Sequence, residues 1–190
     1  MTTWSIGVEG WVLQDTGQDF RRGDRSVFSV MLHPMELRAE PEPARAARPV
    51  ADANLYDVAG PIVYESAETL VLDCGLLLYL WRPDGLTEAG AVTGRGYLWM
   101  EAPGEWPWTE AEAFPPLAYA WEIERIRLET TPWAPIPGGA NAFERNLSRQ
   151  SFEEIEATDA MGADDRRDRH SPDCVFDCRL LDEPPRAVVR

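Results

Sequence analysis

Apolar and polar residues alternate along much of the chain with the two-residue period of a β-strand. The clearest stretch is Leu70–Trp81, in which one face consists only of Leu and Cys. Its members are Leu70, Leu72, Cys74, Leu76, Leu78 and Leu80. Such a face is expected to be buried. Gly75 lies mid-stretch and favours a bulge or sharp bend in a strand over the competing interpretation, a buried helix.

Further stretches with alternating or β-branched residues predict a total of about seven antiparallel strands, separated by turn-forming residues. They cover residues 4–8 with a continuation over 11–13, 26–32 with a continuation to 37, 55–64, 91–101, 117–130 and 174–181. The first two predict an antiparallel hairpin. In 117–130 the apolar positions change phase between Ile123 and Ile126, which indicates a β-bulge near Glu124.

Proline and charge mark the segments between these strands. Residues 38–53 hold three prolines and no aromatic residue, so they are predicted to form an exposed loop. The roughly 37 residues before this loop are few for an independent fold, so one domain over 1–190 is expected. Helical spacing occurs within 141–161, where Ser151 and Glu154 form a capping-box pattern that predicts a short helix.

Together these patterns predict a mainly β fold: a single antiparallel β-barrel or sandwich with long proline-rich loops and at most one or two short helices. The short curved strands over Leu55–Thr130, with glycines at the bends, are similar to an OB-type barrel.

The formal net charge of −15, with every side-chain cation except histidine supplied by arginine, changes the expected partners. An acidic field repels nucleic acid and anionic membranes, whereas it attracts a basic protein. Residues 1–15 lack the pattern of a signal peptide, and no segment has the length and hydropathy to span a bilayer. With only three cysteines, a reducing cytoplasmic setting is expected.

The cysteines lie in a short internal repeat, here called the Asp-Cys repeat. Residues 71–77 and 175–181 match at five of seven positions, including Asp73 with Asp177 and Cys74 with Cys178. We interpret it as two strands that solve the same packing problem, as neighbours in a sheet.

A zinc site of Cys74, His170, Cys174 and Cys178 is the alternative for these residues. In a strand, ligands four residues apart are separated by about 13 Å, too far to share one ion. Buried free thiols are therefore expected and no metal. Phosphate-binding and dinucleotide-binding loops are missing from the sequence, so no cofactor is expected either.

Carboxylates offer the second candidate chemistry. Glu122 and Glu124 share one strand face, as paired catalytic acids would, but the sequence favours a solvated face balanced by the neighbouring Arg125 and Arg127, because no second catalytic carboxylate can be placed. Asp73 and Asp177 interrupt apolar strands, so each is expected to bind a loop or an arginine, or else to have a perturbed pKa.

Tryptophan is concentrated in one third of the chain, partly in a proline-rich loop, where aromatic residues commonly act as binding anchors. They could equally cap the open end of a barrel. The predicted binding residues are Trp106, Trp108, Glu105, Glu110, Glu112, Trp121 and Trp133. The expected function is a non-catalytic acidic module that binds a basic protein, for example an immunity-type inhibitor. The alternative is a small-ligand-binding or hydrolytic barrel that uses Asp73 or Glu122.

Overall fold

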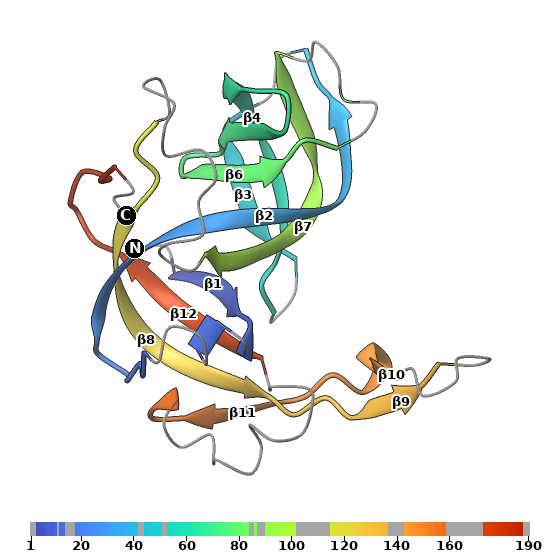
Figure 1. The fold of residues 1–190 in the computed structure, drawn as a ribbon, viewed down its shortest axis with the longest axis vertical. Coiled ribbons are helices and arrows are strands. Elements are labelled where there is room, and N and C mark those ends of the chain that lie inside the picture. The colour runs from blue at the N-terminus through green and yellow to red at the C-terminus, as the bar shows by residue number, and fades with distance from the viewer. Residues whose placement is uncertain are drawn as a thin grey trace.

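The computed structural model describes residues 3–10, 12–13, 18–41, 44–50, 53–83, 86, 90–101, 115–136, 143–158 and 173–187, with backbone only at 133, 143–145 and 147. Their fold is mainly β, which confirms the predicted fold class (Figure 1). The elements are β1 (Thr3–Val8), β2 (Arg25–Ala39), β3 (Ala46–Pro49), β4 (Leu55–Glu65), β5 (Thr69–Asp73), β6 (Leu77–Trp81), β7 (Ala91–Glu101), β8 (Tyr119–Glu129), β9 (Trp133–Pro135), β10 (Phe143–Arg145), the 3₁₀ helix η1 (Leu147–Arg149), β11 (Phe152–Ile155) and β12 (Cys174–Leu180).

Ten of these strands form one sheet in the order β11-β8-β12-β1-β7-β2-β6-β5-β4-β3, and the pairings β8–β2 and β7–β4 close it. The closure creates two five-stranded rings that share β2 and β7. The lower ring in Figure 1 contains β1, β2, β7, β8 and β12, and the upper ring contains β2, β4, β5, β6 and β7. Within these two rings, β1–β7 and β2–β6 are the parallel pairs.

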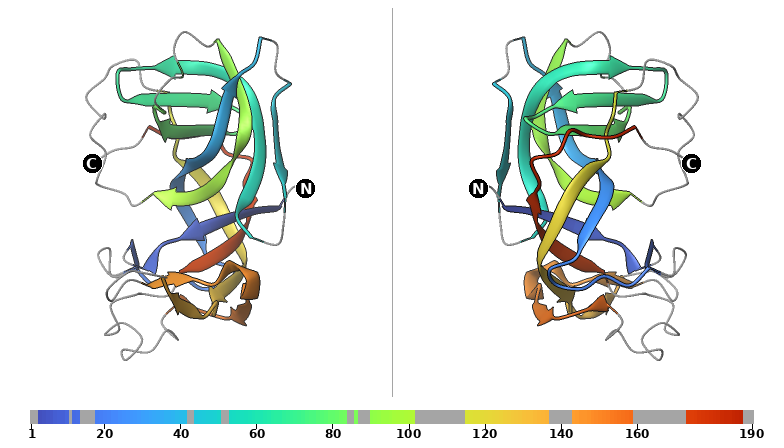
Figure 2. Two further views of the ribbon diagram at one scale, coloured as in Figure 1. Left: turned by 90° about the vertical axis from the view of Figure 1, so that its right-hand side faces the viewer. Right: turned by 90° about the vertical axis from the view of Figure 1, so that its left-hand side faces the viewer.

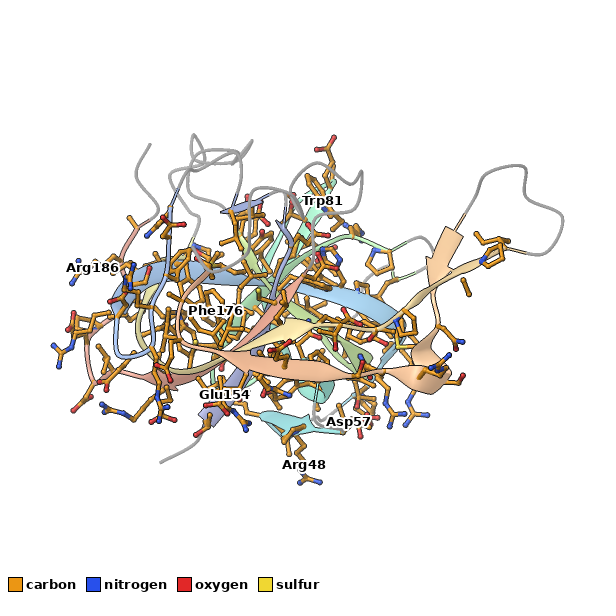
Figure 3. All side chains as sticks on the ribbon, turned by 90° about the horizontal axis from the view of Figure 1, so that it is seen from below. Arg48, Asp57, Trp81, Glu154, Phe176 and Arg186 are labelled. Atoms are coloured by element: carbon orange, nitrogen blue, oxygen red, sulfur yellow. The ribbon has the colours of Figure 1, made fainter. Side chains whose placement is uncertain are left out.

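The apolar faces of the two rings meet in one continuous core. The leucine face predicted from the sequence is buried, with Leu70, Leu72, Leu78 and Leu80 all 0% exposed. Within the core, Phe28 of β2 stacks on Trp121 of the paired strand β8, with ring centroids 5.4 Å apart. Figure 3 shows Phe176 in the interior and Trp81 and Arg186 at the periphery. Burial of each large apolar side chain in this core contributes about 1.5–3 kcal/mol, so the core dominates the stability of the fold.

The stretch Leu70–Trp81 is a hairpin, not the single bent strand predicted. Asp73 pairs with Leu77, and Gly75 lies in the intervening turn with φ of 90°. This left-handed conformation favours glycine, which explains why the chain reverses here. Leu70 pairs with Leu80, so the leucines of both strands still point to one face.

Three further local predictions concern the bulge in β8, the pairing of β1 and the continuation of β1. The bulge in β8 is confirmed, because Arg125 pairs with Asp177 and Ile123 with Cys178, which leaves Glu124 as the extra residue. The predicted hairpin of the first two strands is wrong, since β1 pairs with β12 and β7. Val12 and Leu13 are helical and do not extend β1.

Two segments predicted as a loop and as a helix form strands instead. Residues 46–49, predicted as loop, form the edge strand β3, where Pro49 is tolerated at the strand end. The predicted short helix within 141–161 is replaced by β10 and β11, and β11 pairs with the edge of β8. Figures 1 and 2 place β9 and β10 at the end of the molecule that carries β11. The stretch 55–130 does not close a barrel by itself, because the upper ring needs β2 and the lower ring needs β1 and β12.

Gly60 allows β4 to approach the turn of the β5–β6 hairpin. A Cβ atom at this position would lie 2.2 Å from the carbonyl oxygen of Asp73. We predict that Gly60→Ala destabilises the protein by about 1–3 kcal/mol, the usual cost of overpacking. Gly90→Ala is the matched control, because nothing lies within 4 Å of the point that a Cβ atom would occupy there. Chemical denaturation of both variants measures the difference, and equal stability of the two would contradict the packing described.

The three thiols are free and buried. Burial, with the nearby carboxylates of Asp73 and Asp173 as the smaller cause, raises the pKa of Cys74 and of Cys174 to about 12. Burial also raises the pKa of Cys178. Since the thiolate is the reactive form, we predict negligible reaction with a thiol reagent at pH 8 until denaturant unfolds the chain. Rapid modification of the native protein at more than one cysteine would show that the thiols are accessible.

Candidate functional site

The structure places the sequence-predicted binding residues in different environments. Trp106, Trp108, Glu105, Glu110 and Glu112 lie outside the described residues. Trp133 belongs to β9, and only its backbone is described. Trp121 is 0% exposed and donates a hydrogen bond from Nε1 to the carbonyl of Phe28 (3.1 Å), so its ring belongs to the core and is not presented to a partner.

A pocket of about 240 Å³ lies on the outside of the lower ring, between residues contributed by β7, β8, β11 and β12. Its walls combine aromatic rings, carboxylates and amides. They are formed by Asn54, Tyr97, Trp99, Glu129, Gln150, Phe152, Asp173, Cys174 and Val175. Trp99 belongs to the tryptophan-rich third of the chain, but the sequence did not predict the pocket, because its walls come from five separate segments of the chain.

Trp99 is held against the backbone of β1. Gly7 is its partner in the β1–β7 pair, and a Cβ atom on Gly7 would lie 2.6 Å from the indole ring. Asn54 fixes the adjacent backbone of β7 through two hydrogen bonds with Leu98. Its side-chain Nδ2 donates to the Leu98 carbonyl (2.7 Å), and its backbone carbonyl accepts from the Leu98 amide (2.8 Å). The ring therefore has a defined position at the pocket wall.

His33 lies beside Trp99, with ring centroids 6.1 Å apart. Desolvation by burial lowers the pKa of His33, although the carboxylate of Glu9 opposes this shift. Because the usual histidine pKa is about 6.5, His33 is neutral at physiological pH. The His33 ring therefore carries no positive charge that would compete for the aromatic face of Trp99.

Hydrogen bonds fix the positions of the two acids of the pocket, Glu129 and Asp173. The amide of Glu129 donates to the carbonyl of Asp173 (2.8 Å), and the amide of Gly10 donates to Oδ1 of Asp173 (3.1 Å). These bonds hold two carboxylate-bearing residues beside two aromatic rings from β7. The arrangement is suited to a cation, which is attracted both by carboxylates and by ring faces.

A buried ion network supports the neighbouring strands. Asp177, 3% exposed, binds Arg127 (2.7 Å), Arg125 (2.5 Å) and the hydroxyl of Ser5 (2.7 Å). The guanidinium of Arg127 also lies 5.2 Å from the ring centroid of Phe152, which is a wall of the pocket. Asp177 thus has the arginine partners that the sequence suggested as its alternative to a catalytic role.

The other candidate carboxylates are also paired. Asp73 binds Arg45 (3.1 Å) and accepts the amide of Gly75 (3.1 Å) in the hairpin turn. Glu122 forms an ion pair with Arg179, and Glu124 lies 3.5 Å from the same side chain. None of these three acids lines the 240 Å³ pocket.

A larger hollow of about 400 Å³ lies over β2, β4 and β7, but its chemistry is less distinctive. It is lined by Glu36, Leu37, Arg38, Asp57, Thr93 and Gly94. Asp57 already binds Arg95 (2.7 Å), and that guanidinium lowers the pKa of the carboxyl group. Its described lining includes no aromatic side chain, so the smaller pocket is the better candidate site.

Among the described residues, no three His, Cys, Asp or Glu side chains are placed to hold a metal ion. His170, the histidine of the zinc alternative, lies outside them. The described part of the chain also contains no helix of the length and apolarity needed to cross a membrane. The chain matches no protein-family model, no curated protein and no solved structure.

Asp177→Asn tests the importance of the buried network. Loss of the charge leaves Arg127 buried without its full counter-ion, so we predict destabilisation of about 3 kcal/mol or more. Asp57→Asn is the control, because the Asp57–Arg95 pair is exposed and screened by solvent, and its melting temperature should stay close to that of the wild type. Similar melting temperatures for the two variants would refute a stabilising role for the network.

Proposed function

We propose that this protein is a non-catalytic acidic module that binds a basic protein and receives one of its cationic side chains in the 240 Å³ pocket. An immunity-type inhibitor, which masks a basic active site, is a concrete form of this function. The observation that supports it is the combination of Trp99 and Tyr97 with Glu129 and Asp173 in one concave site. Aromatic faces and carboxylates together favour arginine or lysine over neutral groups.

The size of the pocket supports a side chain as its ligand. Pockets for whole small molecules usually measure about 300–1,000 Å³, more than the 240 Å³ available here. A protein partner would also use the surface around the pocket. The net charge of −15 would steer a basic partner toward the module and speed its association at low salt.

The proline- and tryptophan-rich loop is a second proposed contact. Trp106 and Trp108 would act as aromatic anchors there, and the nearby Glu105, Glu110 and Glu112 would contribute to electrostatic steering. The alternative of a hydrolytic or small-ligand barrel is less well supported, because Asp73 and Glu122 are both paired with arginine.

A peptide experiment tests the proposed site directly. The probe is an acetylated, amidated Gly-Arg-Gly peptide, and its counterpart carries citrulline, which has nearly the same shape without the charge. We predict that calorimetric titration detects the arginine peptide and that citrulline binds at least about tenfold more weakly, since a desolvated cation–π contact contributes about 2 kcal/mol. Raising the salt concentration should weaken the arginine complex.

Two variants locate the binding on the protein. Glu129→Gln and Trp99→Phe should each weaken the arginine peptide several-fold, because one removes charge and the other the best cation-binding ring. Glu68→Gln, an exposed acid outside the pocket, is the matched control and should bind as the wild type does. Equal affinity for the arginine and citrulline peptides, or an equal loss in the control, would overturn the proposal.

A further inference from the structure

We infer that the chain is an internal duplication and that the pocket is the open member of two equivalent faces. The first half provides β1, β2, β4 and β5, and the second half provides β6, β7, β8 and β12 in the same order. The counterparts are β1 and β6, β2 and β7, β4 and β8, and β5 and β12. Exchanging each strand for its counterpart turns the lower ring, β1-β7-β2-β8-β12, into the upper ring, β6-β2-β7-β4-β5. It also turns one parallel pair, β1–β7, into the other, β6–β2.

The strand registers fix which residues are equivalent. Met31 and Trp99 face each other in the central β2–β7 pair, which places the pseudo-two-fold axis between them. Trp99 pairs with Gly7 in the lower ring, and Met31 pairs with Tyr79 in the upper ring. Gly7 is therefore equivalent to Tyr79, and Trp99 to Met31.

The Asp-Cys repeat provides an independent check of this alignment. One residue before the matched positions, Ile6 pairs with Phe176 and Leu78 pairs with Leu72. Phe176 must then be equivalent to Leu72, which aligns 175–181 with 71–77 as in the sequence repeat. The repeat is not a pair of neighbouring strands, because β5 and β12 lie in different rings. It is the part of the duplication that remains visible in the sequence.

A pair of tyrosines provides a second check. Tyr56 in β4 and Tyr119 in β8 are equivalent by the pairing of these strands with β7 and β2. The Tyr56 hydroxyl accepts the backbone amide of Ser5 (2.7 Å), and the Tyr119 hydroxyl accepts that of Leu77 (2.9 Å). Ser5 and Leu77 are themselves equivalent, each two residues before the matched pair. The same unusual side-chain bond thus occurs at both places.

The two equivalent outer faces have diverged at three positions that touch one another. The upper face holds Tyr79, Leu117 and Met31, and the lower face holds Gly7, Asn54 and Trp99. Leu117 and Asn54 are equivalent because each lies two residues before its tyrosine of the matched pair. Tyr79 and Leu117 are 0% exposed and seal the upper face with Val71. The lower face has the equivalent strands beneath it but lacks the sealing side chains, so it stays open as the pocket.

Gly7 is accordingly the residue that determines whether the site exists. A Cβ atom there would lie 2.3 Å from Nδ2 of Asn54 and 2.6 Å from the ring of Trp99. Any side chain at this position would displace two walls of the pocket. Assigning Gly7 and Trp99 to specificity for a cationic side chain rests on the proposed function, whereas the duplication stands on the registers alone.

The triple variant Gly7→Tyr/Asn54→Leu/Trp99→Met transplants the sealing residues of the upper face onto the lower face. Gly7→Tyr alone should be strongly destabilised by the clash with Asn54 and Trp99. If the faces are equivalent, the two further substitutions make room for the tyrosine, and the triple variant should melt at least about 5 °C above the single variant. The double variant Asn54→Leu/Trp99→Met, which leaves the new space unfilled, should melt below the triple variant.

Thermal melting and peptide binding separate the two claims. A triple variant that melts no higher than Gly7→Tyr, or that melts below the double variant, would overturn the equivalence of the faces. With the equivalence upheld, loss of arginine-peptide binding in the triple variant would support Gly7 and Trp99 as specificity determinants, and retained binding would overturn that role. A wild-type protein that fails to bind the peptide would refute the proposed function but leave the melting comparison intact.

Discussion

The antiparallel pairing of β2 with β7 is the constraint on which the rest of this structure depends. It extends from Ser29 opposite Glu101 to Ala39 opposite Val92, and both strands belong to both rings. Each ring closes only because the free edges of this pair accept β8 and β6 on one side and β4 and β1 on the other. Disrupting the pair would open both rings and expose their common core, so the two rings are expected to unfold together.

The same pair explains how one frame supports two different surfaces. Inward-facing residues on both strands, such as Val30 and Leu98, contribute to a core that must remain apolar in both halves. Outward-facing positions carry no such constraint. Met31 therefore packs under a sealed apolar face, whereas its cross-strand partner Trp99 forms a wall of an open pocket. Both halves share the same packing requirement on the inside, so only their outer faces were free to diverge. This difference accounts for a single site in a duplicated fold.

Sequence patterns correctly predicted features that depend on local alternation. They failed where pairing between distant segments determines the structure. The phase change between Ile123 and Ile126 located the bulge, because a bulge shifts the facing of every later residue. In the leucine-rich stretch, a strand and a symmetric hairpin about Gly75 put the same residues on one face, so alternation could not distinguish them. The capping-box pattern at Ser151 was outweighed by the free edge of β8, which β11 occupies. The pocket had almost no sequence signal, because the absence of a side chain at Gly7 matters only beside Asn54 and Trp99.

Native-state hydrogen exchange as a function of denaturant tests the central claim most directly, which is that the shared β2–β7 pair couples both rings. The account predicts that ladder amides of β2–β7 exchange only by global unfolding, and that amides of β1–β12 and β5–β6 merge with them at one common free energy. It would be contradicted if one ring exchanged through a separate lower-energy opening while β2–β7 and the other ring remained fully protected.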